Sequence, residues 1–324
     1  MRRIYHSPRA RVHSAQLPRR CKTGLFGTLA SRGDRGDFER VKMKFLRALF
    51  RLAAIYAILL AVLFALQDRL IYFPRTATEP TLLHEARAVG LEPWRDASGQ
   101  LIGWRRSAPA ARCRAVLFHG NAGSASDRAP FAEALGALAN GRTWEVHLFE
   151  YPGYGARPGK PARKAIEDSA RAALGELLAA DARPLFLLGE SIGSGPACSL
   201  AAEFGERIAG VGLVVPMASL ADTAARHYPF LPARWLLRGQ FDNITALRTY
   251  HGRVAFILAA EDEIVTTADG IRLHDSYGGP KLLNVISGAR HNDIDYSRNA
   301  PWWREMSDFL TRPPTELRSG RHAF

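Results

Sequence analysis

The clearest candidate for chemistry in this sequence is Ser191, which stands in the run Gly189-Glu190-Ser191-Ile192-Gly193. A serine between two such glycines is typical of a nucleophile on a sharp turn, because Cβ atoms two residues away would crowd that turn. The apolar run 184–188 precedes the motif, and a helical pattern over 195–204 follows it. We therefore predict a strand, a tight turn that carries Ser191, and a helix.

A serine hydroxyl needs a general base to become a nucleophile, and the base needs a carboxylate to orient it. We predict His291 as the base and Asp262 as the acid, because they follow the apolar runs 282–286 and 254–259 in the order serine, acid, histidine. Both would lie at the carboxyl ends of parallel strands, where a doubly wound sheet gathers its site. The carboxylates that compete with Asp262 are Glu261, Glu263, Asp269 and Asp293.

Attack by serine on a carbonyl creates a negatively charged oxygen, which donors already in place stabilise. The run His119-Gly120-Asn121-Ala122-Gly123 follows the strand candidate 114–118. We predict an oxyanion hole built from the backbone N–H groups of Asn121 and Ile192. A glycine-rich turn with a capping asparagine is the alternative interpretation, and the two are compatible. This chemistry requires no metal and no cofactor, and we expect neither.

Aromatic residues near these motifs are candidates for substrate contact. Tyr151 and Tyr154 belong to a turn after the strand candidate 146–149, at the rim of the expected site. Tyr228 and Trp235 lie in an apolar segment at about 216–243 that interrupts the rhythm of strands and helices, as a short helical cap would. An apolar cap suits an acyl substrate, although core packing alone would select similar residues.

Short apolar runs alternate with amphipathic segments across the region that must position these residues. Unbroken apolar strands joined by helical crossovers indicate a parallel sheet covered on both faces. We predict an α/β fold with a mostly parallel, doubly wound sheet over residues 67–311, followed by a loose tail at 312–324. The strand candidates are 101–104, 116–118, 146–149, 185–188, 211–215, 254–259 and 282–286, and the clearest helices are 162–180 and 302–310.

The formal charge of +13 is concentrated at the start of the chain. Residues 1–51 contain fourteen Lys and Arg against three Asp and Glu, a net of +11, so the other 273 residues are close to neutral at +2. Residues 1–42 lack apolar periodicity, and we predict a disordered basic arm there. Met43 opens a more conventional start and is our candidate for the true initiator. We expect no nucleic-acid binding, although an arginine-rich arm could bind phosphates non-specifically.

The stretch from Leu52 to Leu66 carries no charge, which favours insertion into a membrane over burial on every side. We predict one transmembrane helix over 45–66, preceding the catalytic domain. A cleaved signal peptide is the rival interpretation, but Leu63 and Ala65 make a poor cleavage site. The basic flank before the helix stays in the cytoplasm by the positive-inside rule, which locates the catalytic domain on the outer side of the cytoplasmic membrane.

The motifs together resemble those of the membrane-anchored α/β-hydrolases related to the yeast bud-emergence suppressor. They are HGNAGS at 119–124, EYPGYG at 150–155, GESIGSG at 189–195, EDEIV at 261–265 and GARHND at 288–293. The resemblance also covers QDRLIYFP at 67–74 and the cap, and it runs to about residue 311. Two residues depart from the family's pattern: Thr266-Thr267 replaces a turn with proline, and Arg290 replaces a common glycine.

Related groups in this superfamily include lysophospholipases and protein depalmitoylases. The resemblance therefore implies an α/β-hydrolase fold and hydrolysis of carboxylic esters or thioesters of acyl lipids or lysophospholipid-like substrates. The serine, histidine and aspartate would act through an acyl-enzyme. Two alternatives stay open, a serine aminopeptidase-like amide hydrolase and a catalytically silent binding domain tethered to the membrane.

Overall fold

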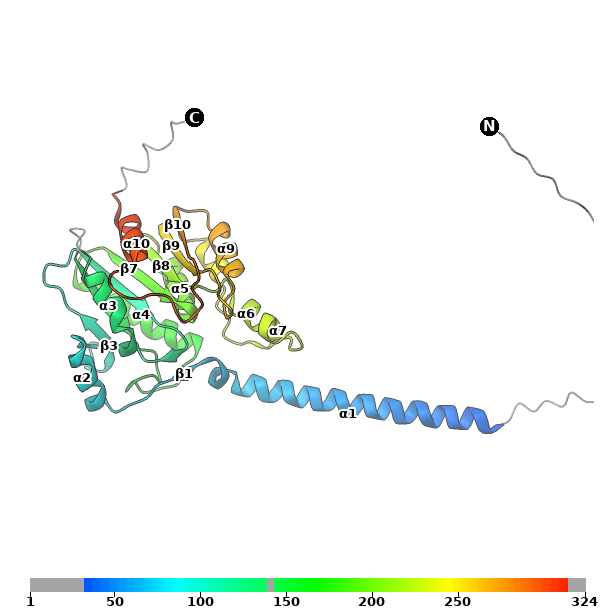
Figure 1. The fold of residues 1–324 in the computed structure, drawn as a ribbon. Helices are drawn as coiled ribbons and strands as arrows, with labels where there is room; N and C mark the ends of the chain where they lie inside the picture. Colours follow the sequence, from blue (N-terminus) through cyan, green and yellow to red (C-terminus); the bar gives the residue numbers. More distant parts are fainter. Residues whose placement is uncertain (1–31, 139–142, 314–324) are drawn as a thin grey trace, which may run out of the picture. The chain divides into compact units, whose positions relative to one another are not determined.

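The computed structural model describes residues 32–138 and 143–313. The chain divides into two units, Met1–Tyr56 and Ala57–Phe324, and the second contains an eight-stranded sheet (Figure 1). Its order is β10-β9-β8-β7-β4-β6-β3-β2. The strands are β2 (Glu92–Arg95), β3 (Leu101–Arg106), β4 (Cys113–Phe118), β6 (Trp144–Phe149), β7 (Leu185–Glu190), β8 (Ile208–Val214), β9 (Arg253–Ala259) and β10 (Lys281–Ile286).

The sheet is parallel from β10 to β6 and antiparallel only where β3 meets β6 and β2. Every residue of β4 is buried, as are the first five residues of β7. Unbroken burial is expected for a strand covered on both faces, so the apolar runs in the sequence predicted these strands correctly. The edge strand β10 is half-buried.

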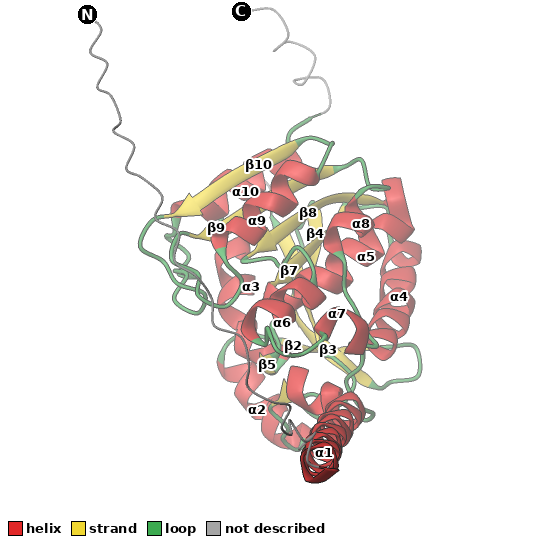
Figure 2. Ribbon diagram, turned by 90° about the vertical axis from the view of Figure 1, so that its right-hand side faces the viewer, coloured by secondary structure: helices red, strands yellow, loops and turns green. Residues whose placement is uncertain are grey.

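Two separate apolar clusters cover the two faces of this sheet, with the strands between the helices in Figure 2. One cluster includes α4 (Arg163–Ala180), α5 (Ser194–Phe204), α8 (Asn243–Leu247) and α9 (Thr267–Ser276). The other includes α2 (Glu79–Ala88), α3 (Ala129–Gly136) and α10 (Pro301–Thr311). The predicted doubly wound arrangement is thus confirmed.

A short helical segment stands between β8 and α8, where the sequence predicted a cap. It contains α6 (Leu220–His227) and α7 (Ala233–Leu236). Ser219 accepts a hydrogen bond from the backbone N–H of Asp222 and so caps α6. We call residues 216–243 the cap from here on.

The first helix is longer than the sequence predicted. α1 runs over Arg32–Ile71, so residues 32–42 of the expected disordered arm are helical, and residues 1–31 lie outside the described residues. The helix continues beyond the expected end at residue 66 because no breaker occurs until Pro74, and residues just before proline favour extended backbone. Its portion Asp37–Ile71 is long and apolar enough to cross a membrane, by length and composition.

The chain leaves α1 through a short strap, which we define as residues 71–77. Within it β1 (Phe73–Pro74) pairs in parallel with β5 (Ala122–Gly123). The strap also pairs with the turn that ends at Gly155, whose backbone N–H donates to the carbonyl of Arg75 at 2.9 Å. Two segments distant in sequence are therefore joined to the end of α1 through main-chain hydrogen bonds.

Candidate active site

Ser191 stands on a strained turn between β7 and α5. Its φ is +52°, in the left-handed region that a non-glycine residue rarely adopts. A Cβ on Gly193 would come within 2.1 Å of the Phe118 carbonyl oxygen, and one on Gly189 within 2.7 Å of the Gly193 carbonyl oxygen. The steric role predicted for both glycines is confirmed. Ser191 itself is half-buried.

The loops after three different strands bring Ser191, His291 and Asp262 together. His291 Nε2 lies 2.9 Å from Ser191 Oγ, and His291 Nδ1 lies 2.8 Å from Asp262 Oδ2. The other carboxylate oxygen of Asp262 accepts the backbone N–H groups of Ile264 at 2.9 Å and Val265 at 2.7 Å. With His291 and Asp262 buried, this chain of hydrogen bonds can carry a proton from a serine hydroxyl to an imidazole.

Two of the carboxylates that compete with Asp262 have other partners. Glu263 pairs with Arg290 at 3.0 Å, and Asp269 is buried beside Arg226 and Arg272. The pKa of the Glu263 carboxyl is lowered, first by a hydrogen bond from its own backbone N–H and also by His291 N–H and Arg290. The Arg290 charge that departs from the family's pattern is thus matched by a neighbouring carboxylate.

Asn121 lies in the loop between β4 and β5, held from three sides. Its carbonyl accepts the N–H of Phe73 at 2.9 Å and the hydroxyl of Tyr154 at 2.6 Å, and its side-chain amide donates to the Ile71 carbonyl at 3.3 Å. Within residues 32–138 and 143–313, the backbone N–H of Asn121 has no acceptor. The N–H of Ile192 belongs to the first turn that follows Ser191, where N–H groups lack intrahelical acceptors. Both groups are available as donors.

Sequence reasoning missed Glu190, which holds the loop between β4 and β5 (residues 119–121, called the oxyanion loop below) against the serine turn. The Gly120 backbone N–H donates to Glu190 Oε2 at 3.1 Å, and Arg128 Nε donates to the same oxygen at 2.5 Å. It also missed Asn243, whose buried amide donates to Ser194 Oγ at 2.9 Å, while Ser194 donates to the Ser191 carbonyl at 2.6 Å. The motifs contain these residues, but no local pattern indicates such long-range contacts.

Tyr151 and Tyr154 are buried beneath the oxyanion loop, which differs from their expected place on the rim of a pocket. The hydroxyl of Tyr151 donates to the His119 carbonyl at 2.6 Å, as that of Tyr154 does to Asn121. Buried tyrosines need such partners. Their hydroxyls point into the protein because the turn after β6 directs them under the loop, so both support the oxyanion loop and leave no side-chain surface for a substrate.

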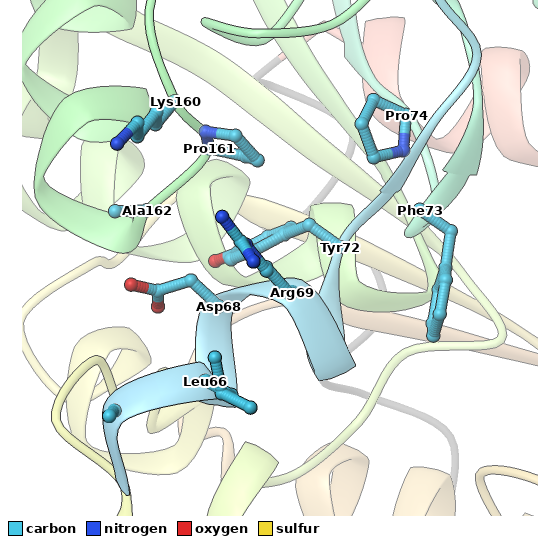
Figure 3. A pocket seen from close by; sticks show the side chains of 10 residues that line it. Leu66, Asp68, Arg69, Tyr72, Phe73, Pro74, Lys160, Pro161 and Ala162 are labelled. Atoms are coloured by element: carbon cyan, nitrogen blue, oxygen red, sulfur yellow. The ribbon is translucent and has the colours of Figure 1, made fainter. Parts of the chain in front are cut away.

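The two cap aromatics lie in different surroundings. Tyr228 lines an apolar cavity of about 380 Å³ beside the end of α1. Trp235 is 90% exposed and is not among the residues that line that cavity. A larger cavity of about 950 Å³ is also lined by the strap, and Figure 3 shows Asp68, Arg69 and Lys160 around it. Neither cavity includes Ser191 in its lining.

Comparison with known proteins gives the family. A model described as the α/β-hydrolase fold matches residues 116–249. An uncharacterised protein of Mycobacterium tuberculosis is 34% identical over 257 residues, which cover 76% of this chain and 87% of that protein. The human α/β-hydrolase domain-containing protein 17B is 29% identical over 193 residues, with 59% of this chain and 64% of the relative covered.

Solved structures share the fold at low sequence identity. An esterase of Pyrococcus furiosus superposes with a TM-score of 0.57 and 15% identity, over 75% of this chain and 97% of the esterase. A hydrolase from a Penicillium species gives a TM-score of 0.52 at 15% identity, over 68% of this chain and 97% of the other. Such likeness establishes the arrangement of strands and helices, and the chemistry must be argued from the residues.

Proposed function

The chain belongs to the α/β-hydrolase fold family, and on that premise we propose that it is a membrane-anchored serine hydrolase of carboxylic esters or thioesters. The observation that carries the proposal is the continuous hydrogen-bonded chain from Ser191 Oγ through His291 to Asp262, with distances of 2.9 and 2.8 Å. Distances in this range allow direct proton transfer between the hydroxyl and the imidazole. The strained serine turn supports the same function.

In the proposed mechanism, His291 Nε2 takes the proton of Ser191 as Oγ attacks the carbonyl carbon. The oxygen that becomes negative accepts hydrogen bonds from the backbone N–H groups of Asn121 and Ile192, and loss of one such donor typically costs about 3 to 4 kcal/mol. His291 then gives the proton to the leaving alcohol or thiol, and an acyl-enzyme forms. Water, deprotonated by the same imidazole, releases the acid and restores Ser191.

Asp262 acts on this cycle through His291. Its hydrogen bond to Nδ1 holds the imidazole with Nε2 facing Ser191 and stabilises the imidazolium that forms in each half-reaction. The N–H groups of Ile264 and Val265 fix the other oxygen of the carboxylate. These bonds stay within the loop between β9 and α9, residues 260–266, which we call the acid loop. This chemistry uses no metal and no organic cofactor.

Amide hydrolysis by an aminopeptidase-like site is the second candidate, and the cap disfavours it. Such a site needs a carboxylate to bind the substrate amine, and the cap offers Asp222 and Asp242. Asp222 pairs with Arg234 at 2.8 Å and Arg272 at 2.6 Å, and Asp242 caps α8. With both carboxylates engaged, an ester or thioester is the better supported substrate.

The proposal also includes the group within the α/β-hydrolase fold family to which the chain belongs and the location of the protein in the cell. The motif strings from HGNAGS to GARHND support a place among the membrane-anchored relatives of the yeast bud-emergence suppressor. The long apolar helix α1 supports a single-pass anchor in the cytoplasmic membrane. The basic residues before the span favour a catalytic domain on its outer side.

A fluorophosphonate probe tests the chemistry directly, because it reacts with an activated serine. We expect the full-length protein to be labelled, Ser191→Ala to be unlabelled, and Ser199→Ala on α5 to be labelled like the parent. Labelling that persists in Ser191→Ala would refute the assignment, and absence of labelling in all three would favour the silent binding domain. A series of p-nitrophenyl esters, lysophospholipids and aminoacyl nitroanilides then separates ester from amide cleavage.

A further inference from the structure

The apolar cavity beside the end of α1 is built from two walls. Leu63, Leu70 and Ile71 of α1 form part of one wall, and the cap supplies the other. Its volume of about 380 Å³ lies in the range of pockets that hold small molecules. The cap residues that line it include Ala224, Leu231 and Leu237.

Hydrogen bonds hold the two walls together. Gln67 is buried in α1, and its side-chain oxygen accepts the backbone N–H of Arg238, while its amide nitrogen donates to the Phe64 carbonyl, both at 2.8 Å. Arg238 also pairs with Asp68 at 3.3 Å and lies 4.9 Å from the centre of the Phe64 ring. These contacts engage both the oxygen and the nitrogen of the Gln67 side-chain amide. The amide of Gln67, which lines the cavity, is therefore paired, and the cavity is preformed and apolar.

Each wall is bonded to a loop of the candidate active site. On the side of α1, the Ile71 carbonyl accepts the Asn121 side chain, and the Phe73 N–H donates to the Asn121 carbonyl. On the side of the cap, His227 Nε2 lies 2.9 Å from the Ile264 carbonyl, in the loop that begins at Asp262. Hydrogen bonds therefore connect one wall of the cavity to the loop that carries Asn121 and the other wall to the loop that carries Asp262.

Several of the apolar side chains that line this cavity are also exposed. Leu70 of α1 and Tyr228 of the cap line the cavity and are about half exposed, and Phe230, two residues after Tyr228, is 71% exposed. The helix that supplies one wall is itself the candidate membrane span. Exposed apolar side chains of this kind favour entry of a hydrocarbon chain over entry of a polar group.

We propose that this cavity binds the acyl chain of a membrane-partitioned ester or thioester, with the anchor helix as one wall of the site. The inference rests on the proposed hydrolase function and names its substrate class. The larger cavity suits a bare hydrocarbon poorly, because Asp68, Arg69 and Lys160 line it (Figure 3). Tyr228 is a substrate contact in this arrangement.

The test compares a long and a short ester on the full-length protein in detergent. The measured quantity is the ratio of kcat/KM for p-nitrophenyl decanoate to that for p-nitrophenyl acetate, after subtraction of the Ser191→Ala rate. Ala224→Phe fills the cavity, and the matched control Ala225→Phe changes the next residue of α6, which is not among the lining residues. Partial misfolding lowers both rates equally, so it leaves the ratio unchanged.

We expect the ratio to fall about tenfold or more in Ala224→Phe, the effect of displacing two or more methylene groups. The ratio should stay within about twofold of the parent in Ala225→Phe, because nothing in the cavity changes. Leu231→Ala enlarges the cavity and should shift the preference toward longer chains.

Two results would overturn the acyl site and leave the hydrolase function standing. One is Ser191-dependent cleavage of acetate with an unchanged ratio in Ala224→Phe, and the other is a parent enzyme without preference for decanoate. Absence of Ser191-dependent cleavage of acetate would instead refute the proposed function, and the acyl site would fall with it. The acetate rate thus distinguishes the two failures.

Discussion

At the scale of single residues, the hydrogen bond to His291 Nδ1 separates Asp262 from the carboxylates around it. Asp262→Asn should lower kcat by about 10³ to 10⁴ because the imidazole would be held in the wrong tautomer. The matched change Glu263→Gln removes an exposed ion pair with Arg290 and should alter kcat by less than about fivefold. Ester turnover by both variants measures the difference, and similar losses in the two would contradict the assignment of the acid.

Gly193 allows the serine turn to pack directly against the end of β4. Gly193→Ala would place a Cβ 2.1 Å from the Phe118 carbonyl oxygen, and we expect it to lower the free energy of unfolding by about 3 kcal/mol or more. Gly175 lies within α4, and a Cβ there meets no atom within 4 Å. Gly175→Ala should therefore raise the free energy of unfolding by about 0.5 to 1 kcal/mol. Denaturant unfolding of the solubilised protein, followed by tryptophan fluorescence, tests both the predicted decrease and the predicted increase in the free energy of unfolding.

At the scale of elements, the strap and the turn after β6 keep the oxyanion loop in place. Tyr154→Phe removes the hydroxyl that donates to the Asn121 carbonyl, and we expect kcat/KM to fall about tenfold, which corresponds to roughly 1.4 kcal/mol. Tyr250→Phe removes a comparable buried hydrogen bond to the Ile208 carbonyl, away from the site. Both should lose about 1 kcal/mol of stability, and only the first should lose activity. Equal activities would show that the loop needs no such support.

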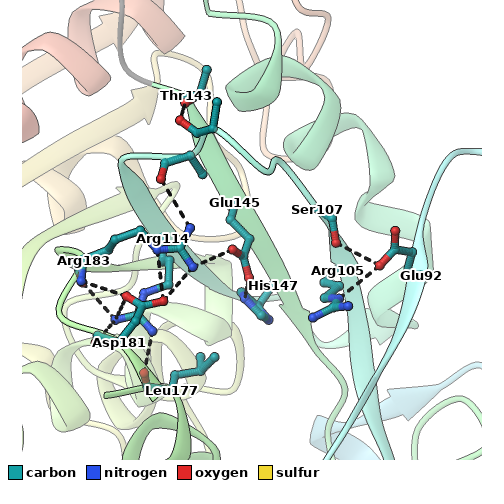
Figure 4. Close-up of polar contacts among 12 residues, drawn as sticks. Glu92, Arg105, Ser107, Arg114, Thr143, Glu145, His147, Leu177, Asp181 and Arg183 are labelled. Atoms are coloured by element: carbon teal, nitrogen blue, oxygen red, sulfur yellow. Dashed lines mark hydrogen bonds and ion pairs between the residues drawn. The ribbon is translucent and has the colours of Figure 1, made fainter. Parts of the chain in front are cut away.

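The strand β6 carries a titratable contact between Glu145 and His147, from which we expect the stability of the domain to depend on pH. Glu145 lies 2.8 Å from His147 Nε2 and accepts a hydrogen bond from Arg183 at 2.8 Å (Figure 4). The bond with His147 first, and that with Arg183 as well, lower the pKa of the Glu145 carboxyl from 4.5 to about 2. A carboxyl whose pKa is lower in the folded state stabilises the fold above its unfolded pKa, and this contribution is lost as the pH falls toward the folded pKa.

Glu145→Gln should therefore lower the free energy of unfolding by roughly 1 to 2 kcal/mol at neutral pH, with the difference shrinking below about pH 4.5. The control is Glu92→Gln, because the ion pair of Glu92 with Arg105 is exposed and should contribute less than about 1 kcal/mol. Unfolding curves from pH 7 to pH 3 provide the comparison. A difference that stays constant with pH would exclude titration of Glu145 as the cause.

The elements of the sheet could be predicted from the sequence, whereas the connections around the site could not. β4, β7, β8 and β9 appear as unbroken apolar runs because both faces of each strand are buried. The pairing of the strap could not be predicted, since β1 and β5 have two residues each and their paired residues are 49 positions apart in the sequence. A two-residue strand has no periodicity to detect, and only the folded chain brings its partner near.

In the candidate site, too, some residues could be predicted from the sequence and others could not. Ser191 could be proposed from the sequence because its turn requires glycines at fixed positions, and the loops after β9 and β10 then limit the choice of acid and base. Glu190 and Asn243 were not found, because their roles depend on partners 70 and 49 residues away. Tyr151 and Tyr154 were expected on a rim, since sequence gives the position of a turn but not the direction of its side chains.

At the scale of the whole molecule, charge and hydrophobicity together predict how the chain crosses a membrane. Lys42, Lys44, Arg47 and Arg51 precede the uncharged stretch 52–66, and only Arg69 and Arg75 follow it closely. Positive residues next to a span are retained in the cytoplasm. We therefore expect the catalytic domain on the outer face of the cytoplasmic membrane.

Protease added to intact spheroplasts that express the full-length chain should digest the catalytic domain, while a cytoplasmic marker resists until the cells are lysed. Carbonate extraction should leave the undigested protein in the membrane, and mass spectrometry should find peptides from 45–66 in it, because an anchor is kept whereas a signal peptide is removed.

Replacing Lys44, Arg47 and Arg51 with glutamate should reduce the protease-accessible fraction, since the basic flank sets the orientation. If the catalytic domain were protected in spheroplasts and the substitutions had no effect, the predicted topology would be wrong. If residues 45–66 were missing from the mature chain, the segment would be a cleaved signal peptide and the enzyme would be secreted.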